Sequence, residues 1–233
     1  MQSILGARSR RIAGALAWLT GALVVGHVSA RAIRYAVGSG SQHLEPILVR
    51  DWEEYLGAQD MRLGLSSAKV VIIEFTDFQC AYCRTLHERL LALRNEFGDS
   101  IVVVSRNFPL PSHSDALGGA AAAQCAAFQG RFPQMADILF RHQDEQETRA
   151  WTSFAKMAGL RDTAAFEACM TSPRVAALIS ADVNAGRQLN VMGTPTVLIN
   201  GLRVRESLSL DLLRRLVRSQ LDKSLPRGQT ETI

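Results

Sequence analysis

The sequence predicts an α/β domain whose sheet is interrupted by a block of helices. Residues 70–75 form a continuous β-branched and apolar run, leucines at helical spacing follow up to Gly98, and a second apolar run covers residues 101–104. After a long helical stretch, residues 195–199 predict another strand, and Asn200-Gly201 predicts a hairpin turn. With 233 residues, we expect one domain that carries an insertion.

The first thirty residues predict export from the cytoplasm. Arg8, Arg10 and Arg11 precede an uncharged, mostly apolar stretch over residues 12–30. Its last three residues, Val-Ser-Ala, are typical of a signal-peptide cleavage site. The stretch also approaches the roughly 20 residues that a spanning helix needs, so a cleaved signal peptide and an N-terminal membrane anchor are both open. Either one predicts an extracytoplasmic protein, in the periplasm or on the outer face of the cytoplasmic membrane.

The remaining segments follow from composition and periodicity. Residues 31–66 mix charge, Gly and Ser with scattered apolar residues, which predicts a tether and a packed lead-in without chemistry of its own. Because a strand, a helix and a strand follow one another in residues 67–111, their strands should pair in parallel. No run of Lys and Arg with interleaved aromatics occurs in the body of the chain, although the net charge is +4, so we expect no nucleic-acid partner.

Residues 112–189 predict only helices. One apolar stripe starts near Phe132, with Pro133 in a first turn, and another starts near Trp151. Asp162 and Ser172 are expected N-caps of two further helices. The sheet then resumes in residues 190–224, with strands at 195–199 and 202–205 and a last helix capped by Ser209; residues 225–233 are expected to be a disordered tail.

Two of the four cysteines lie where a predicted strand passes into a helix. Cys80 and Cys83 are separated by Ala-Tyr, and Cys80 falls at the first turn of the helix. Unpaired backbone N–H groups and the positive end of the helix dipole favour a thiolate there, which predicts an exposed, activated nucleophile at Cys80 and a resolving thiol at Cys83. The alternative is half of a zinc site, but the other two cysteines are not a second closely spaced pair, so we expect no metal.

Cys125 and Cys169 lie in separate predicted helices of the insertion. Each falls on the apolar stripe of its helix, the first with Leu117, Ala121 and Phe128, the second with Phe166 and Met170. We expect a structural disulfide between them because oxidising surroundings favour it, and the closed loop would contribute roughly 4 kcal/mol. The alternative is two buried free thiols that act as small hydrophobic side chains.

The sequence resembles the DsbA-like thioredoxin family over roughly residues 52–222. The resemblance rests on residues 75–83 (Phe-Thr-Asp-Phe-Gln-Cys-Ala-Tyr-Cys), on residues 193–196 (Gly-Thr-Pro-Thr) and on the region from Cys125 to Phe140. The order of elements is also that of a thioredoxin fold with an inserted helical subdomain. The pattern is specific, because a C-x-x-C between a buried strand and a helix accompanies a Gly-Thr-Pro before a late hairpin.

The resemblance implies roles for further residues. Thr194-Pro195 should form a loop with a cis peptide bond that faces the redox pair and binds extended substrate; the alternative is a trans proline that starts an edge strand. Glu74 should lie beneath the pair and assist proton transfer at Cys83, because a carboxyl group in an apolar strand is costly to bury; the alternative is a glutamate that faces solvent. His87 and His113 receive no role.

These features together predict an exported thiol-disulfide oxidoreductase that donates disulfides to cysteine-containing exported proteins. The resemblance implies a membrane quinone-linked thiol oxidase as electron acceptor, no bound cofactor and a monomeric protein. A disulfide isomerase or reductase of the same fold is the first alternative, although residues 31–66 are too short for the dimer platform of an isomerase. A non-enzymatic, membrane-tethered assembly module is the second.

Overall fold

The computed structural model describes residues 46–57, 61–204 and 208–224. The predicted export segment, residues 31–45 of the predicted tether and the predicted tail lie outside these ranges. Within them, no helix combines the length and the apolar character needed to cross a membrane.

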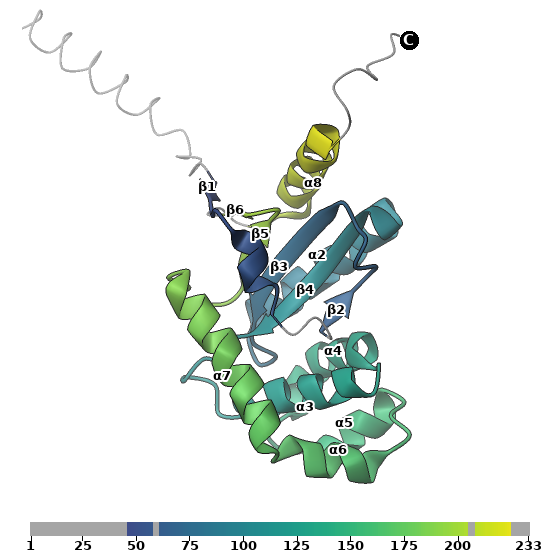
Figure 1. The fold of residues 1–233 in the computed structure, drawn as a ribbon. Helices are drawn as coiled ribbons and strands as arrows, with labels where there is room; N and C mark the ends of the chain where they lie inside the picture. Colours follow the sequence, from purple (N-terminus) through teal and green to yellow (C-terminus); the bar gives the residue numbers. More distant parts are fainter. Residues whose placement is uncertain (1–45, 58–60, 205–207, 225–233) are drawn as a thin grey trace, which may run out of the picture. The chain divides into compact units, whose positions relative to one another are not determined.

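In the described part of the chain, the strands form one mixed sheet in the order β1-β6-β5-β3-β4-β2 (Figure 1). The central strands are β3 (Val70–Thr76) and β4 (Ile101–Asn107), which pair in parallel as predicted, and β5 (Thr196–Ile199) pairs antiparallel with β3. The lead-in contributes more than packing. It supplies β1 (Ile47–Leu48), the short 3₁₀ helix η1 (Trp52–Leu56) and β2 (Arg62–Leu63), so both edges of the sheet come from residues N-terminal to β3.

The pleat of β3 divides its side chains between two layers. Ile72 lies in the cluster that contains the redox helix, whereas Ile73 and Phe75 lie in a second cluster with residues of η1 and of the segment before β5. Successive side chains of a strand point to opposite faces, and both faces of β3 are covered, which explains its continuous apolar sequence. Glu74 has the same parity as Ile72, so it faces the redox helix.

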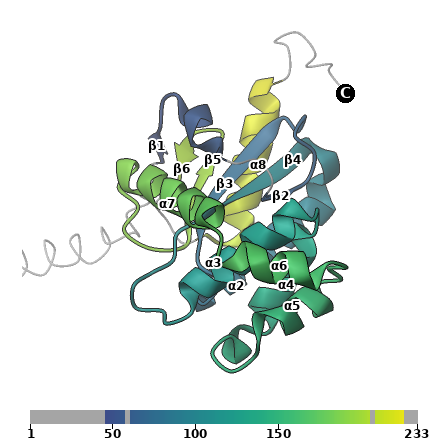
Figure 2. The same cartoon turned by 60° about the horizontal axis from the view of Figure 1, so that its bottom comes forward.

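Helices cover both faces of this sheet (Figures 1 and 2). Helix α2 (Ala81–Phe97) packs with α8 (Leu210–Ser224), which also contacts β3 and β5. The short 3₁₀ helix η2 (Gly98–Ser100) leads from α2 into β4. The predicted cap of the last helix is present, because the Leu212 N–H donates to the Ser209 hydroxyl at 3.2 Å.

The helical insertion is built around α3 (Ala116–Phe128), which contacts every other helix of the block. Nearly all its side chains are small and buried, so its neighbours approach it closely. The prediction that Leu117 belongs to its apolar stripe is wrong, because that side chain is 64% exposed, whereas Ala116, Ala120 and Ala121 are buried. These neighbours are α4 (Phe132–Arg141), α5 (Trp151–Met157), α6 (Thr163–Met170) and α7 (Pro173–Gln188); the short 3₁₀ helix η3 (Gln143–Glu145) follows α4 in the chain.

Both predicted N-caps of this block are confirmed. The side chain of Asp162 accepts the Ala165 N–H at 2.8 Å, and the Ser172 hydroxyl accepts the Val175 N–H at 3.3 Å, with Pro173 in the first turn of α7. These contacts satisfy backbone donors that the first turn of a helix leaves free.

Helix α7 leaves the insertion and packs against β4 of the sheet. A Cβ atom at Gly186 would lie 2.6 Å from the ring of Phe108, so only glycine permits this close approach. Arg106 and Asp182 form a buried ion pair at 2.6 Å in the same contact. The ion pair ties β4 to α7, and the Arg106 guanidinium also donates to the Tyr55 carbonyl, which holds η1 in place.

The predicted hairpin is present between β5 and β6 (Leu202–Arg203). Asn200 and Gly201 have φ values of 43° and 79°, the left-handed conformation that a two-residue turn of this kind requires. The observed strands are shorter than predicted: β5 begins after Pro195, which has no N–H to donate, and β6 ends at Arg203, although the Val204 N–H still donates to the Val197 carbonyl at 3.0 Å.

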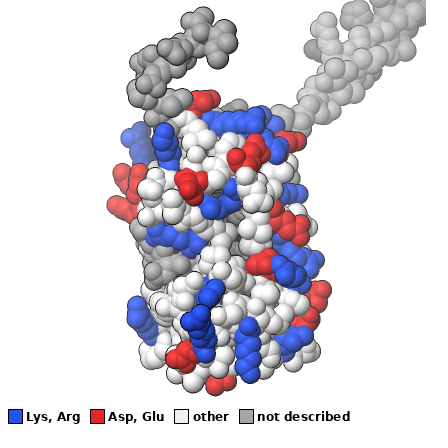
Figure 3. All heavy atoms as spheres, turned by 90° about the vertical axis from the view of Figure 1, so that its right-hand side faces the viewer, with Lys and Arg blue, Asp and Glu red and all other residues white. Residues whose placement is uncertain are grey.

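The surface shown in Figure 3 carries Lys, Arg, Asp and Glu interspersed over the face, with uncharged residues between them. Part of this mixing is specific pairing between α2 and α8, where Glu96 binds both Arg214 and Arg218. Exposed pairs of this type contribute little to stability.

Candidate active site

The redox pair lies at the start of α2, directly behind the end of β3. Cys80 is the N-cap residue, with an extended backbone (φ −78°, ψ 119°). Its N–H donates to the Asp77 carbonyl at 3.0 Å, and its own carbonyl accepts the Arg84 N–H at 3.1 Å. The turn 77–79 therefore places Cys80 at the N-terminus of α2, as the sequence predicted. Cys83 lies one helical turn further on.

The expectation that Cys80 is exposed is wrong: the residue is only 5% exposed. Its Sγ lies 3.3 Å from the carbonyl oxygen of Thr194, on the loop before β5, and can donate to it. The Gln143 side chain donates to the Cys80 carbonyl at 3.0 Å. Two segments far away in the sequence thus contact Cys80, one at its sulfur and one at its backbone.

The surroundings of Cys80 favour its thiolate. Its pKa is lowered to about 5, chiefly by the hydrogen bond from the Cys83 thiol. The Thr194 side chain and the backbone N–H groups of Tyr82 and Cys83 act in the same direction, whereas burial opposes them. Backbone donors at a helix N-terminus are the stabilisation expected for an activated cysteine.

Cys83 has the opposite environment. It is fully buried, and burial raises the pKa of its thiol strongly, with further contributions from Cys80 and from the negative charge of Glu74. Both thiols are free in the structure. The pair is therefore asymmetric, because one sulfur is stabilised as a thiolate and the other as a thiol.

Glu74 is 3% exposed, and β3 is paired on both sides, so the alternative of a solvent-facing glutamate is wrong. Burial raises the pKa of Glu74 to about 7, the charge of Cys80 adds to the rise, and the Thr76 side chain partly opposes it. Its Oε1 has no hydrogen-bond partner among the described residues. A carboxyl group of this kind exchanges its proton near neutral pH.

The peptide bond Thr194-Pro195 is cis, as the resemblance implied. This loop contributes the carbonyl that meets Cys80. Beside it, Met192 is 91% exposed, and Tyr82, between the two cysteines, is 77% exposed. Backbone and apolar side chains are thus both accessible next to the sulfur pair.

Cys125 of α3 and Cys169 of α6 form the expected disulfide, with Cα atoms 5.8 Å apart. They are therefore not available to complete a zinc site with Cys80 and Cys83. Within the described ranges, no group of three or more His, Cys, Asp and Glu side chains is placed to hold a metal ion.

Three residues that support the site had no role in the sequence analysis. The buried Asp77 carboxylate accepts the backbone N–H groups of Gln79 and Leu110, both at 2.8 Å, and contacts His113 Nδ1 at 2.8 Å. Gln143 donates to the carbonyls of Phe78 and Cys80. The available signal was the presence of polar residues, Asp77 and Gln79, between a buried strand and the C-x-x-C; it gave no indication of His113 or Gln143.

Comparison with known proteins places this geometry in a family. A family model described as Thioredoxin matches residues 57–219. The fold is similar to that of a thioredoxin-like oxidoreductase from Silicibacter pomeroyi, with a TM-score of 0.63 and 21% identity over 76% of this chain and 100% of that one. BdbD from Bacillus subtilis has a TM-score of 0.62 and 16% identity, over 70% of this chain and 92% of that one. DsbA2 from Pseudomonas aeruginosa has a TM-score of 0.55 and 21% identity, over 74% of this chain and 97% of that one.

Curated relatives carry a different name. The chain is 30% identical over 203 residues to Na(+)/H(+) antiporter NhaA 3 of Salinispora tropica, which covers 87% of this chain and 30% of that protein. It is 34% identical over 143 residues to Na(+)/H(+) antiporter NhaA 1 of Mycolicibacterium vanbaalenii, and the match covers 60% of this chain and 23% of that protein. The match thus spans about a quarter of the length of these relatives. Because the family model covers most of the chain, the chain belongs to the thioredoxin family, and its C-x-x-C, Cys80 and Cys83, lies at the start of α2.

Proposed function

We propose that this protein donates disulfides to cysteine-containing exported proteins. The observation that carries the proposal is the stabilised thiolate of Cys80, whose pKa is lowered to about 5. Whatever stabilises the thiolate stabilises the reduced protein, and a stabilised reduced form makes the disulfide form a stronger oxidant. The expected extracytoplasmic location supports the same direction, because disulfides form and persist there.

The donation consists of two exchanges. A substrate thiolate attacks Cys80 Sγ of the oxidised protein, the Cys80–Cys83 bond breaks, and Cys83 leaves with the bonding electron pair. A second substrate thiolate then attacks the substrate sulfur of the mixed disulfide, and the Cys80 thiolate leaves. The substrate is oxidised to a disulfide, and the protein is reduced to a dithiol. A membrane quinone-linked thiol oxidase is the proposed acceptor of these electrons.

Glu74 is proposed to supply the proton that Cys83 needs when it leaves. Burial makes a free thiolate at Cys83 unfavourable, and the charge of Glu74 makes it more so. With its pKa raised to about 7, Glu74 is partly protonated near neutral pH and can give a proton and regain it from solvent. The cis-Pro loop, with its carbonyl next to Cys80, is the proposed contact for extended substrate.

The test is the equilibrium potential against glutathione, measured together with oxidation of a reduced, unfolded substrate. Thioredoxin has a potential near about −270 mV and strong oxidants lie near about −120 mV. We expect a value nearer the second and rapid oxidation of the substrate. A potential at or below that of thioredoxin, with failure to oxidise the substrate, would assign the protein to the reductases instead.

The names of the curated relatives favour a second candidate: a module that acts next to a membrane transport protein. Relatives named Na(+)/H(+) antiporters contain a stretch similar to this chain in about a quarter of their length. In this case the partner would be a transporter, and the cysteines need not react. Loss of the cellular function on Cys80→Ser, in a variant that still folds, would exclude a non-enzymatic module.

A further inference from the structure

A buried carboxylate ties the turn before α2 to the loop between β4 and α3. The Asp77 side chain is completely buried, and its Oδ1 accepts the Gln79 N–H at 2.8 Å within the turn. Its Oδ2 accepts the Leu110 N–H at 2.8 Å and lies 2.8 Å from His113 Nδ1, and both of these partners belong to the loop. These contacts satisfy a group that would otherwise be costly to bury. Asp77 is therefore fixed at three points.

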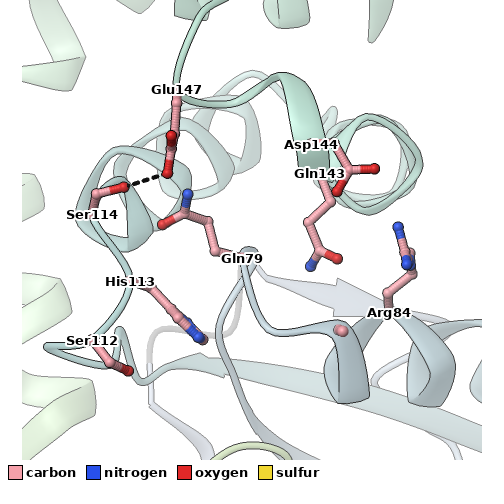
Figure 4. Close-up of a pocket in the computed structure, with 9 residues that line it drawn as sticks. Gln79, Arg84, Ser112, His113, Ser114, Gln143, Asp144 and Glu147 are labelled. Carbon is pink, nitrogen blue, oxygen red and sulfur yellow. Dashed lines mark hydrogen bonds between the residues drawn. The ribbon is translucent and has the colours of Figure 1, made fainter.

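A neighbouring side chain makes a second link between the turn and the loop. Gln79 Oε1 accepts the Asp115 N–H at 2.7 Å, directly before α3. Figure 4 shows both segments along a polar cavity of about 470 Å³, with Gln79 from the turn and residues 112–114 from the loop in its wall. Asp77 and Gln79 thus anchor the turn to residues that lie 33 to 36 positions away in the sequence.

The backbone of Asp77 contacts both cysteines of the redox pair. Its carbonyl accepts the Cys80 N–H at 3.0 Å. Burial raises the pKa of the Cys83 thiol strongly, and a backbone hydrogen bond from Asp77 acts against this rise. A backbone group that favours the thiolate is a donor, so this contact comes from the Asp77 N–H. The residue that the loop holds in place therefore also directs a donor at the Cys83 sulfur.

We propose that Asp77 is a positioning residue, whose carboxylate holds its own backbone N–H against the Cys83 sulfur as that sulfur leaves. A substrate thiolate attacks Cys80 Sγ, the Cys80–Cys83 bond breaks, and the bonding electron pair passes to Cys83 Sγ. The Asp77 N–H donates to the negative charge that develops there, and a proton from Glu74 then forms the thiol. This inference rests on the proposed function, because it concerns the first exchange of disulfide donation.

The size of the expected effect follows from the placement of the donor. A fixed donor stabilises developing charge without having to reorient, and its removal typically lowers an enzymatic rate by roughly 10²-fold to 10³-fold. A change of the Asp77 side chain keeps the backbone N–H and alters only its position, so we expect a smaller loss of about tenfold. When the reduced protein attacks an external disulfide through Cys80, Cys83 is not the leaving group, and we expect no loss.

The experiment compares these two reactions in Asp77→Asn, which keeps the shape of the side chain but turns one acceptor into a donor. In the first reaction, the oxidised protein is mixed with an aromatic thiol that is already ionised at pH 7, and the rate of mixed-disulfide formation is measured. In the second, the reduced protein is mixed with an aromatic disulfide, and the absorbance of the released thiolate is followed. We expect the first rate to fall about tenfold and the second to equal that of the wild type.

Asp182→Asn is the matched control. Asp182 is also a buried carboxylate and accepts a backbone N–H, from Asn107 at 2.9 Å, but it belongs to the contact between β4 and α7. We expect lower stability and wild-type rates in both reactions. His113→Ala repeats the test if Asp77→Asn does not fold, because it removes one of the three contacts of Asp77. It should slow the first reaction about twofold to threefold and leave the second unchanged.

A wild-type rate of the first reaction in Asp77→Asn, or in His113→Ala where that variant replaces it, would overturn the inference. So would an equal loss in both reactions, since this indicates a general distortion of the turn, or the same loss in Asp182→Asn. A wild-type protein that reacts in neither assay would instead overturn the proposed function, and the inference with it.

Discussion

The two cysteine pairs of this protein differ in what surrounds them. Cys80 and Cys83 lie at a helix N-terminus beside a buried carboxyl group, and their thiols are free. Cys125 and Cys169 join two helices of the insertion among alanine and phenylalanine side chains, and they are bonded. In the first pair, hydrogen bonds stabilise a thiolate at Cys80, whereas the second pair lies in the apolar core of the insertion.

This difference shows that cysteine reactivity is set by the surroundings of the sulfur. A thiolate is the attacking species in exchange, so a sulfur that receives backbone hydrogen bonds can react readily. The Cys125–Cys169 disulfide joins two helices of the insertion and restricts the unfolded chain. The predictions below test this division of roles, starting with the largest effect.

The largest effect is expected at Cys80. Cys80→Ser should abolish exchange and trap almost no substrate, whereas Cys83→Ser should accumulate mixed disulfides, because the thiol that releases the substrate is missing. Each variant in its reduced form is mixed with a substrate that contains a disulfide, so that a thiolate attack breaks the substrate bond and leaves a mixed disulfide; non-reducing electrophoresis and mass spectrometry of the linked peptides measure both variants. Equal trapping by the two variants would reverse the assignment of nucleophile and resolving thiol.

Removal of the Cys125–Cys169 disulfide should lower the free energy of unfolding and leave the exchange rate unchanged. The bond joins residues 44 positions apart, for which the chain-entropy relation gives about 4 kcal/mol. The double variant Cys125→Ala with Cys169→Ala should lose up to this amount in urea unfolding and keep the exchange rate of the wild type at 25 °C. In the wild type, graded reduction with alkylation should open the redox pair first. Finding Cys125 and Cys169 alkylated before any reductant is added would contradict the structural disulfide.

Glu74→Gln should stabilise the reduced protein at high pH. The pKa of Glu74 is raised from 4.5 to about 7 in the folded protein. Its favourable contribution to the free energy of unfolding is therefore fully present below about pH 4.5 and is lost as pH rises through 7. The variant should therefore unfold like the wild type near pH 4 and be more stable above pH 7, by up to about 3 kcal/mol. Its exchange should be slower, because Cys83 loses its proton donor.

Urea unfolding across this pH range measures the effect, with Glu88→Gln as control, since Glu88 is an exposed carboxyl group of α2. A gain in stability that is independent of pH would show that Glu74 does not titrate in this range.

The smallest effect is expected at Thr194. Thr194→Val removes a buried hydroxyl that lowers the pKa of Cys80 but keeps the backbone carbonyl, so the pKa of Cys80 should rise. The rise should be smaller than in Cys83→Ala, because the hydrogen bond from Cys83 is the larger cause. Ultraviolet absorbance of the thiolate during titration measures both. A larger rise in Thr194→Val than in Cys83→Ala would show that the loop before β5 makes the main contribution to stabilising the Cys80 thiolate.

Local patterns were sufficient to predict the central strands, the redox helix, its N-terminal cysteine and the hairpin. Each of these depends on neighbours within a few residues: an apolar run, leucines at helical spacing, or Asn-Gly at a turn. The place of Glu74 inside an apolar strand was a local observation too, and it correctly indicated a buried carboxyl group. The disulfide was predicted from the compartment and two apolar stripes, although Leu117 was wrongly included in one of them.

Tertiary contacts decided the rest. The burial of Cys80 depends on Thr194, 114 positions away, and the Asp77–His113 contact spans 36 positions. The ion pair of Arg106 with Asp182 and the edge strands β1 and β2 likewise join distant segments through a few polar or backbone contacts. A hydrophobic pattern indicates which face of an element is buried, but it does not identify the residues that this face contacts. The sequence therefore located the reactive sulfur, whereas the folded chain determined the burial and the pKa of Cys80.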